Sequence, residues 1–231
     1  MYRSLLGAVA LLLGSSAWAQ QAPTQSDFHE MAKDVVTVAG YKWLAPAEAT
    51  GLTGFSLGAY GVYLPITDKE AYRNLSGRDL SEIGMVGLVA QKGLPFGFDL
   101  GIIYGYLPEE NVKTFGVGLQ YAVLEGSVAT PAVALRAGYH ELIGVNSPEV
   151  YGYSFDVAVS KGFANLTPYG SIGYLRGRLN SYDDIPGIVK EDLDLMRITL
   201  GLRASFGLFD ITPEYEHAGS HSFNMRLGFS F

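Results

Sequence analysis

Two groups of residues in the C-terminal half have the residue types needed for hydrolytic chemistry. One is the adjacent pair Asp183 and Asp184, and the other is Ser220 with His217 and His221 on either side. Paired carboxylates near an imidazole can activate water, and a serine, a histidine and an acid can together attack an ester. Two aspartates before Ile-Pro-Gly are also ordinary turn residues. We therefore expect no enzyme, with a surface hydrolase acting on lipid or peptide as the alternative.

Motifs for metals, cofactors and nucleic acids are missing from the sequence. The chain has no cysteine, which excludes disulfides and thiolate metal sites. No histidine pair has metal-ligand spacing within one expected helix or strand, and no phosphate loop or dinucleotide fingerprint occurs. The net charge of −7, without a basic block, argues against a nucleic-acid partner. We expect neither cofactor nor metal.

A second set of charged residues recurs on one face of several alternating runs. This candidate charge cluster consists of Arg136, Asp156, Arg203, Asp210, Glu214 and Arg226. If the intervening loop is symmetric, Arg136 faces Asp156, and Arg226 is expected to pair with Asp210 and Glu214. Unpaired charges are costly in a poorly hydrated interior, so we interpret the cluster as structural salt bridges. The alternative is that these charges line a narrow polar path.

Alternating strands are the elements that would bring these charges together. In residues 221–231, Phe223, Met225, Leu227, Phe229 and Phe231 alternate with small or polar residues, as expected for a strand. Comparable runs cover residues 55–63, 81–92, 98–106, 115–123, 133–139, 151–159, 168–179, 196–206 and 209–215. They predict roughly ten strands, or eight or twelve if weak runs merge or split.

Three features indicate that the apolar face contacts lipid. Residues 1–19 resemble a secretory signal peptide, with Arg3, an apolar stretch and the sequence Ala17-Trp18-Ala19. The second face is rich in Gly, Ser, Ala and Thr, and aromatic residues gather at the ends of the runs. We predict an all-β fold, a transmembrane antiparallel up-and-down β-barrel formed by residues 51–231.

Residues 20–50 form a separate N-terminal segment in this prediction. Asp27 and Glu30 resemble a capping box, and apolar residues at helical spacing predict a short helix from Asp27 to Ala39, ending near Gly40. Two positions remain open for this segment. It is either a periplasmic helix that covers the barrel mouth or a plug within the lumen.

The expected orientation follows from loop lengths. With both termini in the periplasm, residues 92–95, 125–131, 161–168 and 207–208 form inward turns. Residues 65–79, 107–111, 143–149, 180–192 and 217–221 then face outward. Two of these outward loops are longer than any inward turn, which fits the usual asymmetry of such barrels.

Several short motifs resemble a group of proteobacterial outer-membrane β-barrel proteins of unassigned function. They lie at residues 46–48, 51–55, 92–97, 129–136, 160–163 and 166–169. The resemblance implies location in the outer membrane of a Gram-negative cell and carries no activity. Phe229 and Phe231 resemble the signal read by the barrel assembly machinery. The expected partners are that machinery, outer-membrane lipid and lipopolysaccharide, and the expected role is structural, interactive or that of a narrow conduit.

Overall fold

A closed ring of ten antiparallel strands dominates the computed structural model, which describes residues 22–108, 111–144, 149–180 and 187–231. Each strand pairs with its neighbours in the sequence, and β1 pairs with β10 to close the barrel. The predicted signal peptide, residues 1–19, and the Asp183-Asp184 pair lie outside the described residues. The predicted fold class, an all-β transmembrane barrel of about ten strands with a short N-terminal helix, is confirmed.

The elements follow one another in a simple order along the chain. They are α1 (Gln25–Ala39), β1 (Phe55–Pro65), α2 (Lys69–Ser76), β2 (Glu82–Gly93), the short 3₁₀ turn η2 (Pro95–Gly97), β3 (Phe98–Leu107), β4 (Val112–Leu124), β5 (Ala132–Ile143), β6 (Val150–Ser160), β7 (Leu166–Leu179), β8 (Glu191–Phe206), β9 (Phe209–Ala218) and β10 (Ser220–Ser230).

Strand β10 shows how the alternation in sequence becomes the two faces of the wall. Phe223, Met225 and Leu227 are exposed on the outside of the barrel. Asn224 and Arg226 are buried on the inside. Because side chains in a strand alternate between faces, the same sequence supplies a lipid-facing surface and a polar lumen.

The N-terminal helix begins earlier than the sequence indicated. Thr24 is the N-cap of α1, and its hydroxyl accepts a hydrogen bond from the backbone N–H of Asp27. The Asp27 carboxylate in turn accepts from the Thr24 backbone N–H at 2.9 Å, which completes a capping box. The predicted start at Asp27 with Glu30 as its partner is therefore wrong, and the Glu30 side chain instead pairs with Lys33.

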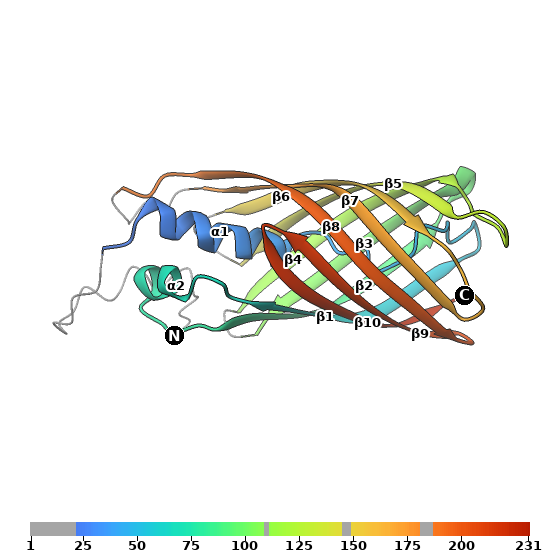
Figure 1. Ribbon diagram of the computed structural model, residues 1–231, viewed down its shortest axis with the longest axis horizontal. Helices are drawn as coiled ribbons and strands as arrows, with labels where there is room; N and C mark the ends of the chain where they lie inside the picture. Colours follow the sequence, from blue (N-terminus) through green and yellow to red (C-terminus); the bar gives the residue numbers. More distant parts are fainter. Residues whose placement is uncertain (1–21, 109–110, 145–148, 181–186) are drawn as a thin grey trace.

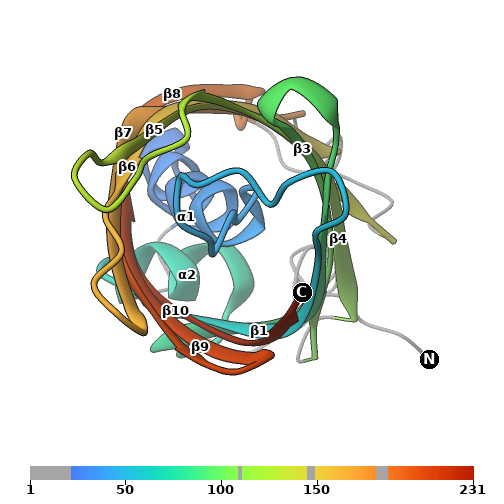
Figure 2. The same cartoon turned by 90° about the vertical axis from the view of Figure 1, so that its right-hand side faces the viewer.

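Helix α1 lies inside the ring of strands, as the view along the barrel shows (Figure 2). It occupies the barrel end that carries α2 and the longer loops, which we call the long-loop mouth (Figure 1). Residues 40–50 continue from α1 through the lumen towards the opposite end, the short-turn mouth, where β1 begins and Phe231 lies. The described start of the chain and Phe231 are thus at opposite ends, contrary to the expectation of two termini on one side.

The loop between β1 and β2 contains a helix that the sequence did not indicate. Asp68 caps α2 by accepting hydrogen bonds from the N–H groups of Glu70 and Ala71, and Gly77 ends the helix with a φ of 68°. Helix α2 packs against α1, and the Tyr72 hydroxyl joins the two by donating to Asp34 of α1 at 3.1 Å. Neither described helix is long and apolar enough to cross a membrane.

Candidate functional site

The candidate site is the contact between the barrel wall and the N-terminal segment that fills the lumen. Residues 40–50, which we call the plug strand, form an irregular stretch and not a β-strand in the structure. Their backbone groups are bound instead by side chains of the wall. Gln91 donates to the carbonyl of Trp43 at 2.7 Å, and the hydroxyl of Ser160 accepts from the N–H of Ala47 at 3.0 Å. Buried backbone groups need such partners, so the wall holds the segment at many points along its length.

Tyr41 provides the closest fit between the plug strand and the wall. Gly101, Gly118 and Gly138 lie directly opposite one another on β3, β4 and β5. A Cβ added at Gly118 would lie 2.6 Å from Cζ of Tyr41, and one added at Gly138 would lie 2.9 Å from its Cβ. The glycine-rich inner face is therefore the surface that makes room for the plug strand.

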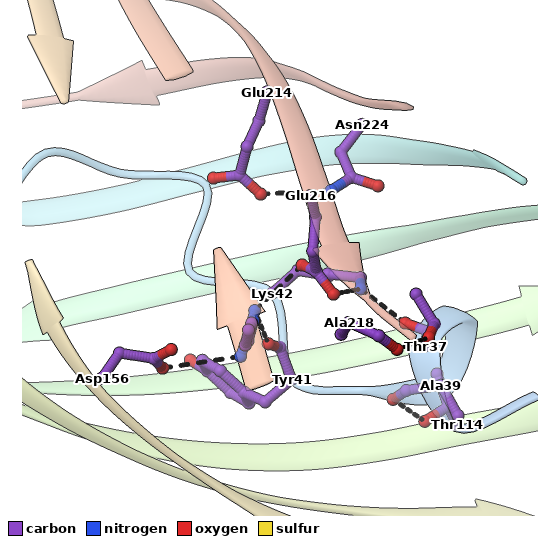
Figure 3. Close-up of polar contacts among 11 residues, drawn as sticks. Thr37, Ala39, Tyr41, Lys42, Thr114, Asp156, Glu214, Glu216, Ala218 and Asn224 are labelled. Atoms are coloured by element: carbon purple, nitrogen blue, oxygen red, sulfur yellow. Dashed lines mark hydrogen bonds and ion pairs between the residues drawn. The ribbon is translucent and has the colours of Figure 1, made fainter. Parts of the chain in front are cut away.

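Lys42 anchors the plug strand in a buried network of charges (Figure 3). Its ammonium group donates to Glu216 at 2.7 Å and to the carbonyl of Thr37 at 2.6 Å. The side chains of Lys42 and Glu216 are both 0% exposed. Arg197 bridges the other carboxylate oxygen of Glu216, at 3.0 Å, and the carbonyl of Tyr41, at 2.8 Å. A buried charge requires this kind of pairing, so the network commits the segment to one position.

Arg136 and Asp156 face each other across β5 and β6, as the sequence indicated, yet they have different partners. Arg136 donates through Nε to Gln120 and through Nη2 to the carbonyls of Ala45 and Pro46, at 2.7 and 2.6 Å. The ion pair of Asp156 is with Arg197, at 3.5 Å. The expected Arg136–Asp156 salt bridge is corrected accordingly, because the plug strand supplies acceptors closer to Arg136.

The charges nearest the C-terminus form a smaller group at the short-turn end. Arg226 Nη1 lies 2.7 Å from Asp210, and Arg203 Nε lies 3.9 Å from the same carboxylate. The expected pairing of Glu214 with Arg226 is not observed. The Glu214 carboxylate accepts hydrogen bonds from Tyr169 at 2.7 Å and from Asn224 at 3.1 Å.

Of the residues with hydrolytic potential, the structure describes Ser220, His217 and His221, and Ser220 lies apart from the two imidazoles. Ser220 points inward and donates to Asp34, whereas His217 and His221 stack with ring centroids 4.5 Å apart. The Tyr215 hydroxyl lies 2.6 Å from Nδ1 of His221. Because Ser220 bonds into the buried interior and His221 is exposed on the strand's other face, the serine and this imidazole are not placed to act together. Among the residues the structure describes, no three His, Cys, Asp or Glu side chains are grouped to hold a metal ion.

Asp34 is a buried carboxyl where α1 meets α2 and the β9–β10 turn. Burial raises its pKa above the ordinary value of 3.8, and the hydrogen bonds from Ser220 and Tyr72 act in the opposite direction. The folded state therefore favours the protonated form of Asp34 relative to an exposed aspartate.

A recess of about 260 Å³ lies near the short-turn mouth, between the end of the plug strand and the wall. Trp43, Asp99, Gln120 and Arg203 are among the residues that line it. Asp99 also accepts a hydrogen bond from the backbone N–H of Thr50 at 3.0 Å, which fixes the last turn of the segment before β1.

The sequence interpretation missed four residues that carry this site: Tyr41, Lys42, Arg197 and Glu216. Arg197 and Glu216 occupy polar positions in alternating runs, so their facing was readable from the sequence. Lys42 and Tyr41 lie between a helix and a proline, in a stretch without periodicity. A cationic residue flanked by two aromatics before a Gly-rich barrel was the only local signal.

Comparison with protein families gives a match over residues 83–231, which is well over half of the chain. The chain belongs to the family of unknown function DUF6588. The matched region begins in β2 and runs through β10, so it covers most of the wall and excludes the plug strand. No curated protein matches the chain.

Three solved structures illustrate the similarity to other barrels. A de novo designed transmembrane β-barrel has 13% identity and a TM-score of 0.38, covering 80% of this chain and 99% of that one. The outer membrane protein OprG from Pseudomonas aeruginosa has 10% identity and a TM-score of 0.36, covering 81% and 99%. Ail of Yersinia pestis, solved with a heparin analogue, has 12% identity and a TM-score of 0.32, covering 77% and 97%.

Proposed function

We propose that this protein is an outer-membrane β-barrel that its own N-terminal segment closes, with a structural or interaction role. The observation that carries the proposal is the Lys42–Glu216 ion pair, which joins the plug strand to the wall and has no exposed side-chain surface on either partner. An open aqueous path would hydrate such a pair. A lumen filled to this degree favours a closed barrel over a conduit.

The cellular setting is part of the same proposal. A signal peptide at residues 1–19 would carry the chain out of the cytoplasm of a Gram-negative cell. The barrel assembly machinery would then read Phe229 and Phe231, and the finished barrel would contact outer-membrane lipid and lipopolysaccharide. The exposed apolar side chains around the wall support a lipid-facing position.

Conductance in planar bilayers tests whether the barrel is closed. The chain from residue 20 onward, refolded and inserted, should show no steady conductance steps. A variant combining Tyr41→Ala, Lys42→Ala and Trp43→Ala removes the side chains that seat the plug strand and should produce steps. Lys69→Ala, at an exposed position of α2, is the matched control and should stay closed. Steady steps from the unmodified barrel would overturn the proposal.

We also propose that the protein is not an enzyme. The inward position of Ser220 and its hydrogen bond to Asp34 support this view, because the hydroxyl is committed to a buried carboxyl. Phospholipid hydrolysis and peptide cleavage by the refolded barrel are the direct assays. Hydrolytic activity that is present in the unmodified protein and lost in His221→Ala would overturn this part of the proposal and favour the surface hydrolase.

A further inference from the structure

We infer that the N-terminal segment enters the barrel from the cell surface, so that the exposed start of α1, at Ala22 to Ser26, faces the outside of the cell. This inference rests on the proposed outer-membrane location. It specifies the direction in which the segment runs through the barrel. The start of α1 and the start of β1 would lie on opposite sides of the membrane.

Contacts along the segment fix where each part of it lies. At the long-loop mouth, the Gln25 side chain donates to Glu191 at 2.7 Å and accepts from the N–H of Val189 at 2.9 Å. At the other end, the N–H of Thr50 donates to Asp99 near the start of β3. Val189 precedes β8 on the long-loop side, and Asp99 follows the short turn after β2. The segment therefore reaches from one mouth to the other.

The length of the segment agrees with a complete crossing. The 15 residues of α1 extend about 22 Å at the usual helical rise. The plug strand is irregular, with Leu44 at a φ of 48°, so it adds less than the about 35 Å that the same residues would span if extended. The hydrocarbon thickness of a bilayer is about 30 Å, so the helix leaves only about 8 Å for the plug strand to cover.

Loop lengths assign the long-loop mouth to the outside. The two longest connections, β1 to β2 with the whole of α2 and β7 to β8, both lie at this mouth, and every connection at the other mouth is shorter than these two. The β9–β10 connection, a single residue at Gly219, is the short exception at the long-loop mouth. Barrels of the outer membrane have short periplasmic turns and longer extracellular loops. Phe231 and the start of β1 are then periplasmic, and the start of α1 is extracellular.

The start of α1 is open to solvent at that mouth. Ala22, Thr24 and Ser26 are exposed. From Phe28 onward the helix is largely buried against the wall and against α2, where Asn74 donates to Asp27 at 3.3 Å. The boundary between exposed and buried residues at the start of α1 is thus where the chain leaves the barrel.

Cysteine labelling on intact cells tests the direction, because the natural chain has no cysteine. The probe is a polyethylene-glycol maleimide too large to cross the outer membrane. Ser26→Cys reports on the start of α1, and Lys69→Cys on α2 reports on the long-loop mouth. Ala129→Cys, which is exposed in the β4–β5 turn, reports on the short-turn mouth. Only protein with the heat-dependent gel mobility of a folded barrel is scored, and Ala22→Cys replaces Ser26→Cys if that variant does not fold.

The expected result is labelling of Ser26→Cys and Lys69→Cys on intact cells, with Ala129→Cys labelled only after the outer membrane is permeabilised. If Lys69→Cys labels on intact cells and Ser26→Cys does not, the inferred direction is wrong while the proposed location stands. Labelling of Ala129→Cys alone on intact cells would overturn the orientation as well. Absence of labelling at all three positions until permeabilisation would overturn the proposed location.

Discussion

The ring of Tyr41 lies against the backbone of Gly118, where an added Cβ would be 2.6 Å from Cζ of the ring. Gly118 is the middle member of a row of three glycines, with Gly101 and Gly138 opposite it on the adjacent strands. Because these three positions have no side chains, the inner face of the wall has room for the ring of Tyr41. Because protein interiors are densely packed, a single added methyl group there must displace the ring or the strand.

Replacing Gly118 by alanine should destabilise the barrel. Overpacking of this kind costs about 1–3 kcal/mol, and we expect a loss of that size in the free energy of unfolding. Urea-induced unfolding in detergent micelles measures it. Gly84→Ala on β2 is the matched control, because no described atom lies within 4 Å of the Cβ it would add. In a Tyr41→Ala background Gly118→Ala should cost much less, and an undiminished loss there would contradict the proposed fit.

Replacing Lys42 by methionine should be more damaging. It leaves the buried Glu216 carboxylate with the ion pair to Arg197 but without its contact to the plug strand. Breaking a buried pair from one side costs about 3–5 kcal/mol, so we expect a large fall in the free energy of unfolding and faster proteolysis of the plug strand. Without Lys42, Arg197 has to balance both Glu216 and Asp156, so adding Glu216→Gln should recover part of the stability by removing the excess negative charge.

Lys33 provides the comparison for Lys42. It pairs with Glu30 on the same helix, and both side chains are partly exposed, at 21% and 34%. Exposed pairs contribute about 0–1 kcal/mol, so Lys33→Met should change stability little. Equal effects of Lys33→Met and Lys42→Met would show that burial of the Lys42–Glu216 pair is not what holds the segment.

The wall of the barrel was predictable from sequence because its determinants are local and repetitive. Period-two alternation in residues 221–231 correctly separated outward-facing Leu227 from lumenal Arg226. Symmetric loops then placed Arg136 opposite Asp156, and the structure has that register. The facing of side chains and the pairing register are set by the strands themselves. Each alternating run of about ten residues therefore indicates both.

The contents of the lumen were not predictable in the same way. Two of the three acceptors that bind Arg136 are the backbone carbonyls of Ala45 and Pro46, and because every residue has a carbonyl, no residue type marks them. The Lys42–Glu216 pair joins positions 174 residues apart through a segment without periodicity. Such contacts depend on where the segment lies inside the closed barrel, which alternation does not specify.

The different partners of Arg136 and Asp156 can be separated by double-mutant cycles. Arg197→Met and Asp156→Asn should be non-additive in the free energy of unfolding, because Arg197 and Asp156 form an ion pair at 3.5 Å. Arg136→Met and Asp156→Asn should be closer to additive, since Arg136 is bonded to Gln120 and the plug strand. Stronger coupling of Asp156 to Arg136 than to Arg197 would reinstate the salt bridge expected from the register alone.

The buried Asp34 should make the free energy of unfolding of the barrel depend on pH, with greater stability in acid. Burial raises its pKa in the folded barrel above 3.8, so the folded state binds this proton more tightly than the unfolded state does. The stabilising contribution is complete below about pH 3.8, the value for an exposed aspartate, and is lost as the pH rises through the folded-state pKa. Relative to Asp34→Asn, which cannot titrate, the unmodified barrel should therefore be most stable in acid and lose its advantage towards neutral pH.

Urea unfolding of the two proteins over a series of pH values from acid to neutral measures this difference directly. Subtracting the Asp34→Asn curve removes the titration of all other groups, so the remaining slope belongs to Asp34. Ser220→Ala should steepen the slope, because the Ser220 hydroxyl donates to the carboxylate and lowers its pKa. A difference that grows towards neutral pH would mean that the hydrogen bonds from Ser220 and Tyr72 outweigh burial, and that the ionised carboxylate is the form that holds α1 against α2.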